Sequence, residues 1–332
     1  MISSVKVTRS RPARLTVKKI RDPVGYPPSV RVLLLVNATA SSVTARKRVM
    51  IRKMLAAQHD VEVAETSRRG HATRLAHAAA NDGFDVVAVL AGDGTLNEAA
   101  DGLLHSATAL APLPGGSTNV YARTLGIPND VIDATNTLLA SLNRASLKRI
   151  GVGMANQRPF LFNTGIGFDA AVIRRVERYG ELKRYASHPL HVAAAFEAFA
   201  RREGIRTGVD IELDNGTTIQ GVRFAIVSKT DPYTYLGKIP LHVAPEAGLE
   251  RPLALTAFVS LDAISLLGGA LSAMRKGRWL AKRKAIKQAH DVRRMIVRSA
   301  EPFPYQVDGD DIGNTNQLDL EYAPDVLTVV VP

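Results

Sequence analysis

The sequence has no cysteine and a single tryptophan among its 332 residues, and aromatic residues make up only 5% of it. Without cysteine the chain can form no disulfide and cannot use a thiolate as a nucleophile or a metal ligand. This composition is compatible with a reducing cytosol. The few aromatic side chains leave little surface on which nucleic-acid bases could stack. Since no RNA- or DNA-binding motif is present either, we expect no nucleic-acid partner.

Long apolar runs are also absent. No stretch of about 18 apolar residues occurs, which is the length that a membrane-spanning helix needs. The basic N-terminus, residues 1–19, has no apolar segment of the kind that a secretory signal carries. We therefore expect a cytoplasmic protein. With 46% hydrophobic residues, the chain is long enough for two domains with cores of their own.

Acidic residues are outnumbered: 31 Asp and Glu face 43 Lys and Arg, which gives a formal net charge of +12. The excess is concentrated in residues 1–31, with eight basic residues and one acid, and in residues 275–294, with nine basic residues and one acid. The second segment also has a partial apolar face that includes Trp279. Such a segment favours binding to an anionic membrane surface, and a solvated basic helix is the alternative. We expect peripheral attachment to the inner face of the membrane.

The two halves of the chain differ in pattern. Residues 30–148 alternate between apolar strands and amphipathic helices, which predicts an open α/β sheet domain with helices on both faces. The predicted strands span 31–37, 61–66, 85–91 and 108–114, and the predicted helices span 42–57, 71–82, 96–104, 118–125 and 129–143. Residues 149–332 predict an antiparallel β-sandwich domain with a helical block at 169–203, and its last strand could pack back on the first domain. Asn215-Gly216 predicts a type I′ hairpin turn. Residues 1–29 predict a flexible basic arm.

A strand-to-helix turn, "VLAGDGTLNE", contains the first candidate site. Gly92, Asp93 and Gly94 follow a buried strand, and ligands of open α/β sheets bind at the carboxyl ends of strands. Glycine allows close approach to a ligand, and the free N–H groups of a helix start favour phosphate. Thr95 and Asn97 add side-chain donors and acceptors. Because Asp93 would repel a bare phosphate, it indicates a bridging cation. A plain capped turn is the alternative.

Two further segments resemble parts of such a site. In "PLPGGSTNVYAR" the run from Gly115 to Asn119 again offers N–H and hydroxyl groups at a helix start, after the next predicted strand. In "YQVDGDDIG" three acids, Asp308, Asp310 and Asp311, cluster at a glycine-containing turn between two strands. An ordinary Asp-Gly hairpin turn is the alternative for the last segment.

The order "GDGTLNE", "PGGSTNVYAR" and "VDGD" resembles the diacylglycerol kinase catalytic family, over residues 31 to about 331. That family includes soluble bacterial lipid kinases and is related to sphingosine and ceramide kinases. NAD kinases are more distant and share the Gly-Asp-Gly-Thr core. The resemblance implies an ATP- and Mg²⁺-dependent lipid kinase with its active site in the cleft between the domains. Diacylglycerol is the first acceptor to consider, and a sphingoid base or NAD are the alternatives.

The resemblance also implies residue roles. Asp310 corresponds to the proton acceptor, Asp93 to an acid that anchors Mg²⁺, and Asp308 to an acid that holds the metal or orients Asp310. The nucleotide contacts that it implies are Asn37, Thr66, Gly92, Asp93, Gly94, Thr95, Asn97, Glu98, Gly115, Gly116, Ser117, Asn119 and Arg123.

The sequence departs from the family pattern at acidic positions. Val120 stands where many bacterial members have an acid after the second glycine loop. Glu250 and Arg251 stand at the two acids of a structural metal site, so we expect no second metal there. These departures keep open a catalytically weak homologue that only binds nucleotide or lipid. The sequence also leaves open whether the chain forms a homodimer.

Overall fold

The structure, a computed structural model, describes residues 29–37, 44–167, 208–237, 239–260 and 285–332. The predicted helical block 169–203 and nearly all of the predicted N-terminal arm lie outside the described residues. Residues 275–284 of the basic segment lie outside them as well. Among the helices that the structure describes, none is long and apolar enough to cross a membrane.

The N-terminal half alternates strands and helices as the sequence predicts. Its elements are β1 (Arg31–Asn37), α1 (Ala45–Ala56), β2 (Asp60–Thr66), α2 (His71–Asn81), β3 (Val86–Ala91), α3 (Asp93–Leu103), β4 (Ala109–Pro114), α4 (Val120–Thr124) and α5 (Val131–Asn143). The four strands are parallel and lie in the order β2-β1-β3-β4. Their carboxyl ends therefore meet at one edge of the sheet.

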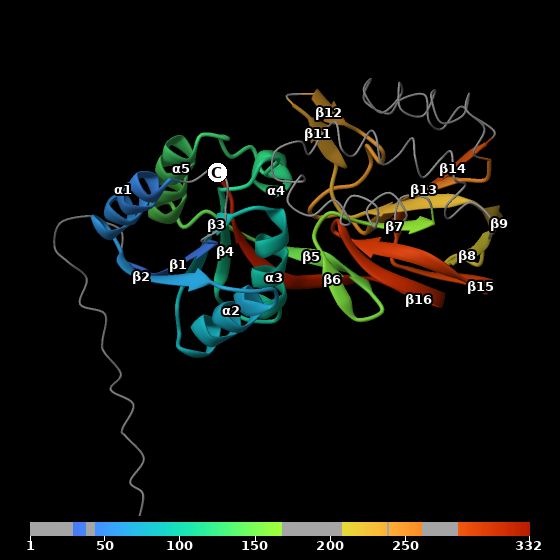
Figure 1. Ribbon diagram of the computed structural model, residues 1–332, viewed down its shortest axis with the longest axis horizontal. Helices are drawn as coiled ribbons and strands as arrows, with labels where there is room; N and C mark the ends of the chain where they lie inside the picture. The colour runs from blue at the N-terminus through green and yellow to red at the C-terminus, as the bar shows by residue number, and fades with distance from the viewer. Residues whose placement is uncertain (1–28, 38–43, 168–207, 238, 261–284) are drawn as a thin grey trace, which may run out of the picture.

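Both faces of this sheet are buried, which explains the continuous apolar runs of its central strands. Leu33 and Leu35 of β1 belong to a core cluster with residues of α2 and α3, whereas Val32 and Leu34 belong to a second cluster with residues of α1 and α5. Successive strand residues point to opposite faces, so the alternation follows from the pleat. Figure 1 shows α1 and α5 on one side of the sheet and α2 and α3 on the other.

The C-terminal half consists of strands in its described part. They are β5 (Leu147–Ala155), β6 (Arg158–Phe160), β7 (Asn163–Gly167), β8 (Val209–Leu213), β9 (Thr218–Val222), β10 (Phe224–Ser228), β11 (Thr234–Leu236), β12 (Ile239–Leu241), β13 (Leu253–Phe258), β14 (Ile286–Val292), β15 (Arg294–Val307) and β16 (Asp310–Val330). All described pairings within this half are antiparallel. A third apolar cluster, with members from β7, β8, β10, β13, β15 and β16, forms its core. This architecture confirms the predicted combination of an α/β region and an antiparallel β region.

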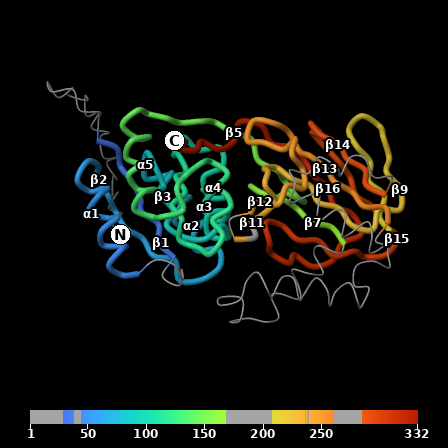
Figure 2. The backbone as a smooth tube through the Cα atoms, turned by 90° about the horizontal axis from the view of Figure 1, so that it is seen from above, coloured from blue at the N-terminus to red at the C-terminus, as the bar shows by residue number. Residues whose placement is uncertain are grey.

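One strand joins the two halves. β16 pairs with β15 and β5 in the C-terminal half, and then runs parallel to β4, with Thr328 opposite Ala109. The strands consequently form one continuous 14-stranded sheet, and only β11 and β12 form a separate pair among the described strands. Figure 2 shows the red C-terminal segment running back into the blue-green N-terminal half.

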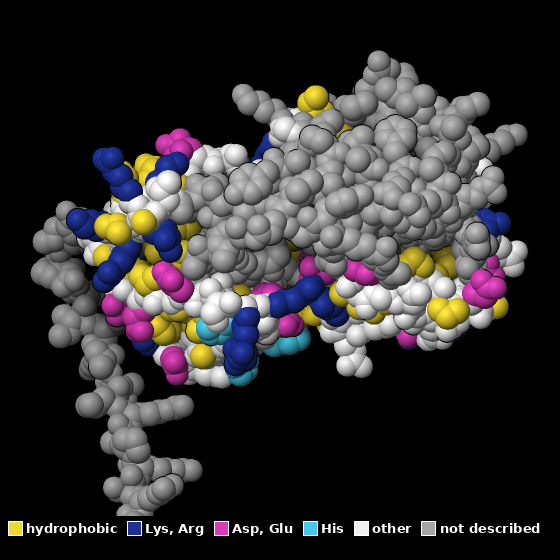
Figure 3. All heavy atoms as spheres, viewed as in Figure 1, with side chains coloured by type: hydrophobic (Ala, Val, Ile, Leu, Met, Phe, Trp, Pro, Cys, Tyr) yellow, Lys and Arg dark blue, Asp and Glu magenta, His cyan; other side chains and the backbone are white. Residues whose placement is uncertain are grey.

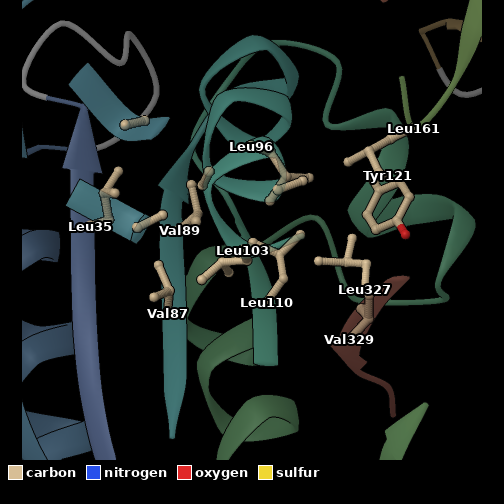
Figure 4. Packing of buried hydrophobic residues seen from close by; sticks show 14 of the residues in the cluster. Leu35, Val87, Val89, Leu96, Leu103, Leu110, Tyr121, Leu161, Leu327 and Val329 are labelled. Atoms are coloured by element: carbon tan, nitrogen blue, oxygen red, sulfur yellow. The ribbon is translucent and has the colours of Figure 1, made fainter. Parts of the chain in front are cut away.

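The returning strand also completes the N-terminal core. Leu327 and Val329 of β16 pack in the cluster that contains Leu103 and Leu110, as Figure 4 shows. Tyr121 of α4 and Leu161, after β6, lie in the same cluster. The two halves therefore share a hydrophobic core at their junction as well as a sheet.

Three local predictions differ from the structure. Helix α3 begins at Asp93 and not at residue 96, so Asp93 occupies the first helical position. The type I′ prediction is wrong: of the two turn residues only Gly216 has a positive φ, 81°, whereas type I′ requires it at both. In the basic segment, residues 286–292 form strand β14, so this part is not helical.

Candidate active site

The carboxyl ends of the parallel strands bring the first predicted residues together. The Asn37 amide at the end of β1 donates a hydrogen bond of 3.1 Å to the Thr95 hydroxyl in the first turn of α3. Thr66 ends β2 and is buried. Gly92 and Gly94 flank Asp93 where β3 passes into α3. The sequence prediction of a cluster at this edge of the sheet agrees with these positions.

Asp93 connects the first glycine loop, residues 92–94, to the second glycine loop, residues 115–117. One of its carboxylate oxygens accepts the N–H of Val120 at 2.9 Å, and the other accepts the N–H of Tyr121 at 3.2 Å. These donors begin α4, directly after the second glycine loop. Burial raises the pKa of the Asp93 carboxyl, while the two backbone hydrogen bonds oppose that shift. Asp93 thus holds the second loop against the first, a role that its position in the sequence did not indicate.

The two glycines of the second loop are required by the close approach of that loop to the end of β3 and to Gly92. A Cβ atom on Gly116 would lie 2.7 Å from the Cα atom of Gly92, and one on Gly115 would lie 2.7 Å from the nitrogen of Ala91. Both distances are too short for any side chain. Gly94 differs, because a Cβ there would meet no atom within 4 Å. Of these glycines, Gly94 is the one that faces open space.

Asn119 organises the second loop from within. Its side chain accepts the N–H of Gly116 at 2.8 Å and donates to the carbonyl oxygen of Gly116 at 3.0 Å. Its amide also donates to the side chain of Asn129 at 2.9 Å. The residue has a positive φ of 50° and is buried, with 5% of its surface exposed. Ser117, by contrast, is exposed.

Asp308 occupies the tight turn between β15 and β16, with a φ of 49°. Its carboxylate accepts three backbone N–H groups, those of Leu161, Phe162 and Asn163, at 2.7 to 2.9 Å. Burial raises the pKa of this carboxyl to about 7; the three hydrogen bonds oppose the shift, and the negative charge of Asp93 adds to it. Asp93 and Asp308 are therefore close enough to interact electrostatically, although they come from different halves of the chain.

Asp310 follows two residues later and contacts two arginines. Its Oδ2 atom lies 2.5 Å from a guanidinium nitrogen of Arg69 and 2.7 Å from one of Arg158. Arg69 belongs to the loop between β2 and α2, and Arg158 begins β6. The ion pair with Arg69 therefore joins the N-terminal half to the turn that carries Asp308 and Asp310.

Two cavities meet at this junction. The junction cavity has a volume of about 300 Å³ and is lined by Asp93, Gly94, Thr118, Val120, Phe162, Asn163, Tyr233, Thr234, Asp308, Gly309 and Asp310. The arginine cavity has a volume of about 180 Å³ and is lined by Arg69, Gly70, Thr73, Gly94, Asn97, Glu98, Asp101, Arg158, Pro159 and Asp310. Gly94 and Asp310 line both. The first glycine loop and the predicted proton acceptor therefore face the same two spaces.

Comparison with known proteins shows what the chain is similar to. Residues 31–152 match the model of the diacylglycerol kinase catalytic domain. Over this part, which is less than half of the chain, the sequence is similar to that domain. A diacylglycerol kinase of Bacillus subtilis is 32% identical over 142 residues, which cover 41% of this chain and 46% of that protein. A diacylglycerol kinase of Staphylococcus carnosus is 22% identical over 306 residues, covering 90% of this chain and 95% of its own.

The extent of the match varies among relatives. An uncharacterised protein of Synechocystis is 22% identical over 76% of this chain and 56% of its own. The chain thus spans about half the length of this relative and of the Bacillus subtilis enzyme. Among solved structures, a diacylglycerol kinase of Bacillus anthracis aligns with a TM-score of 0.63 at 21% identity, over 91% of this chain and 97% of its own. An NAD kinase of Archaeoglobus fulgidus in complex with ATP aligns with a TM-score of 0.51 at 11% identity, over 90% of this chain and 93% of its own. These likenesses establish a shared fold.

Within this fold, Arg123 has an unexpected position. Its guanidinium donates to the carbonyl oxygen of Gly237 at 3.1 Å and stacks 3.4 Å from the centre of the Tyr235 ring. Both partners belong to the hairpin formed by β11 and β12, whose preceding residue Tyr233 lines the junction cavity. Arg123, for which the sequence predicts a nucleotide contact, therefore fixes a wall of this cavity in the structure.

Asn97 and Glu98 face the arginine cavity from the first turns of α3. Asn97 is 7% exposed, and its side-chain oxygen has no hydrogen-bond partner. A buried acceptor without a partner costs free energy unless a ligand or water supplies a donor. Glu98 accepts the N–H of Ala72 at 3.3 Å and so connects α3 to α2.

Sequence reasoning missed three residues at the site: Arg69, Arg158 and Gln306. The buried Gln306 accepts the N–H of Gly309 at 2.8 Å and donates to Asn163 at 2.9 Å, so it shapes the turn that carries the acids. Only Arg69 had a detectable signal, because it lies in the short segment that follows the strand end at Thr66. At the departure from the family pattern, the Arg251 guanidinium pairs with Asp291 and Glu246.

A metal ion would find only part of a coordination shell in the described residues. They contain no group of three or more His, Asp or Glu arranged to hold one. Mg²⁺ is usually bound through one or two carboxylates together with substrate phosphates and water. Asp93 and Asp308 both line the junction cavity, so they could supply the one or two carboxylates that Mg²⁺ needs in addition to phosphate and water.

Proposed function

We propose that the protein is an ATP-dependent lipid kinase that transfers the γ-phosphoryl group of ATP to a lipid hydroxyl, with diacylglycerol as its first expected acceptor. The observation that carries the proposal is the junction cavity. Asp93 and Gly94 of the first glycine loop reach it from the N-terminal half, and Asp308 and Asp310 reach it from the C-terminal half. The match of residues 31–152 to the model of the diacylglycerol kinase catalytic domain supports the same reaction class.

The nucleotide would lie at the carboxyl edge of the parallel sheet. Asn37, Thr66 and Thr95 lie at strand ends or in the first turn of α3, and we assign them to nucleotide contacts. The backbone from Gly92 to Gly94 and the backbone of Ser117 would supply N–H groups for the phosphates, because the N–H groups of Gly115 and Gly116 already donate within the protein. Phosphoryl transfer depends mainly on such positioning and on charge neutralisation.

The acceptor would enter the junction cavity. Val120, Phe162 and Tyr233 give its wall apolar surface, and Asp310 supplies a carboxylate. The hydroxyl oxygen of the acceptor bonds to the γ-phosphorus while the bond to the ADP oxygen breaks. Its proton passes to Asp310 as the new bond forms, since a lipid hydroxyl is not acidic at neutral pH.

Asp93 and Asp308 are the residues that would hold Mg²⁺. A bound Mg²⁺ would neutralise the charge that develops on the transferring phosphoryl group. Between them, the two carboxylates already accept five backbone N–H groups. Those bonds fix the orientation of both carboxylates, so the protein need not rearrange them when the cation binds.

Two alternatives rest on specific observations. The likeness of the fold to an NAD kinase in complex with ATP favours testing NAD and a sphingoid base as acceptors. Val120 and Arg251, at positions where relatives carry acids, favour testing whether the protein only binds nucleotide or lipid. Neither residue removes one of the three acids that line the junction cavity.

Peripheral membrane attachment is part of the proposal, because the acceptor is insoluble. We assign it to the basic segment 275–294, of which residues 285–294 are described. Lys287 lies on β14 and is exposed. Each basic residue near an anionic surface contributes roughly 1 kcal/mol, so this segment could bind such a surface without inserting into it.

The test is a phosphotransfer assay with labelled ATP and Mg²⁺ against diacylglycerol, sphingosine and NAD, with the lipids in mixed micelles. We expect labelled phosphatidic acid from diacylglycerol, and a loss of label transfer of about 10²–10⁴-fold with Asp310→Asn. Labelling of NAD alone would favour the NAD kinase alternative. Binding of ATP with no transfer to any acceptor would favour the binding homologue and contradict the proposal.

A further inference from the structure

The carboxylate that would accept the proton is held by two arginines at the same oxygen. Arg69 and Arg158 both contact Oδ2 of Asp310, at 2.5 and 2.7 Å. A carboxylate oxygen has two lone pairs in its plane, so these contacts use the acceptor capacity of Oδ2. For this oxygen to take a proton from an acceptor hydroxyl, one of the arginines must leave.

The two arginines differ in how firmly they are held. The Arg69 side chain is 62% exposed, whereas that of Arg158 is 40% exposed and comes from a strand next to the turn. Exposed ion pairs contribute little to stability, because water competes for both partners. Arg69 is therefore the partner that can leave at low cost, and it belongs to a loop of the N-terminal half, next to the nucleotide edge of the sheet.

The surroundings of Arg69 show where it could go. Arg69 and Gly94 line the same cavity of about 180 Å³, and Gly94 belongs to the first glycine loop. A triphosphate at that loop would present several negative oxygens to the cavity, and a planar guanidinium binds phosphate through paired charge-assisted hydrogen bonds. Figure 3 shows basic and acidic side chains next to each other at this junction, between α2, α3 and the β5–β6 hairpin.

We propose that Arg69 is a phosphate-binding residue that leaves Asp310 when nucleotide binds and so frees Oδ2 of Asp310 for the proton of the acceptor. The inference rests on the proposed function, in which a nucleoside triphosphate binds at the first glycine loop. Arg158 stays on Asp310 and keeps the carboxylate in position. Phosphate binding and release of Oδ2 are then one event, so Oδ2 of Asp310 becomes available only when a phosphoryl donor is present.

The inference makes a distinctive claim about competition: Asp310 and the nucleotide compete for Arg69. The experiment measures the affinity of the full-length protein for Mg·ATP and for Mg·tripolyphosphate by calorimetry, in the wild type, Arg69→Met, Asp310→Asn and the double variant. Arg68 is exposed and precedes Arg69 in the same loop. The variant Arg68→Met therefore removes the same charge and is the matched control.

We expect Arg69→Met to weaken both ligands by roughly 10- to 100-fold, as for a lost charge-assisted hydrogen bond, and Arg68→Met to change affinity by no more than about twofold. Asp310→Asn should tighten binding a few-fold, because it removes the competing carboxylate. In the Arg69→Met background it should change nothing. Asp310→Ala repeats the comparison without a side-chain amide, and circular dichroism checks that each variant is folded.

Unchanged affinity in Arg69→Met would overturn the inference, as would an equal effect of Asp310→Asn with and without Arg69. Weakening of ATP binding without weakening of tripolyphosphate binding would mean that Arg69 binds the nucleoside and not phosphate. A wild type that binds neither ligand would refute the proposed function itself. The expected competition in a protein that transfers no phosphate would support the role of Arg69 while refuting the kinase.

Discussion

Replacing Asp308 by asparagine tests the electrostatics of the site through stability, without reference to activity. Burial is the main cause that raises the pKa of this carboxyl from 3.8 to about 7. A folded-state pKa above the unfolded value means that ionising the group weakens the folded state. The contribution of protonated Asp308 to stability is therefore fully present below about pH 4, and it is lost as the pH rises to about 7.

The magnitude follows from the size of the shift. At about 1.4 kcal/mol per pKa unit, a shift of roughly three units corresponds to at most about 4 kcal/mol. Asparagine imitates the protonated carboxyl, since it keeps one acceptor oxygen and carries no charge. It cannot accept all three N–H groups of residues 161–163, which costs about 1–3 kcal/mol at every pH. We therefore expect the variant to be less stable than the wild type at about pH 4.5, and to lose much less stability than the wild type as the pH rises.

Urea denaturation followed by circular dichroism, in buffer without divalent cations, measures both curves between about pH 4.5 and about pH 8. Asp60→Asn, which removes a charge at an exposed position, controls for the general effect of charge. Adding Mg²⁺ at about pH 8 should stabilise the wild type and not Asp308→Asn, because the ionised Asp308 is a proposed ligand. If the free energies of unfolding of the wild type and Asp308→Asn fell in parallel with rising pH, the reasoning would be refuted. The loss of stability in the variant would then not depend on the ionisation of Asp308.

Four further predictions concern the loops, the acids and the basic segment. Asp93→Asn leaves one of the N–H groups of Val120 and Tyr121 without an acceptor, so it should lower the free energy of unfolding by about 1–3 kcal/mol. It also removes the negative charge proposed to hold Mg²⁺, so turnover should fall on the order of 10² or more. Near-normal turnover at saturating Mg·ATP would contradict this prediction. Asp310→Asn should still bind nucleotide while transfer falls about 10²–10⁴-fold; if Asp308→Asn abolishes transfer and Asp310→Asn does not, the two acids have exchanged roles. Gly116→Ala places a Cβ 2.7 Å from the Cα atom of Gly92, so it should weaken nucleotide binding and lower the melting temperature. Gly94→Ala, whose Cβ meets no atom within 4 Å, should leave the melting temperature nearly unchanged. Equal melting temperatures of the two variants would disprove the loop contact. Replacing Lys282, Arg283, Lys284 and Lys287 with Gln should weaken co-sedimentation with anionic vesicles, and salt should do the same; equal binding of the wild type to neutral vesicles would contradict the electrostatic mechanism.

The alternation of the N-terminal half was predictable because its signals are local. Buried parallel strands form continuous apolar runs, such as residues 31–37, and the helices between them repeat apolar residues with helical spacing. The start of α3 was placed three residues late, because Gly92 and Gly94 suggested a loop where the chain is already helical from Asp93. Glycine lowers helix propensity but does not prevent a helical turn that tertiary contacts support.

The contacts of the site were less predictable, because they join residues far apart in the sequence. The types of the acids indicated a phosphate and cation site, yet their partners are backbone N–H groups that no side-chain pattern reveals. Asp308 and Leu161 are 147 positions apart. Arg158 gave no signal, and the glycines of the second loop suggested ligand binding where the structure shows that the two loops touch. A sequence displays which groups are present, whereas long-range pairing decides which groups meet.

The strand β16 has a consequence for the way the chain folds during its synthesis. The edge of β4 receives its neighbour from Thr328 and Val329, which leave the ribosome roughly 200 residues after β4 itself. Until then the N-terminal half would expose an unpaired strand edge and an incomplete core, both of which favour aggregation. The α/β half therefore cannot finish folding as an independent N-terminal unit, and we expect arrested nascent chains that lack β16 to depend on chaperones.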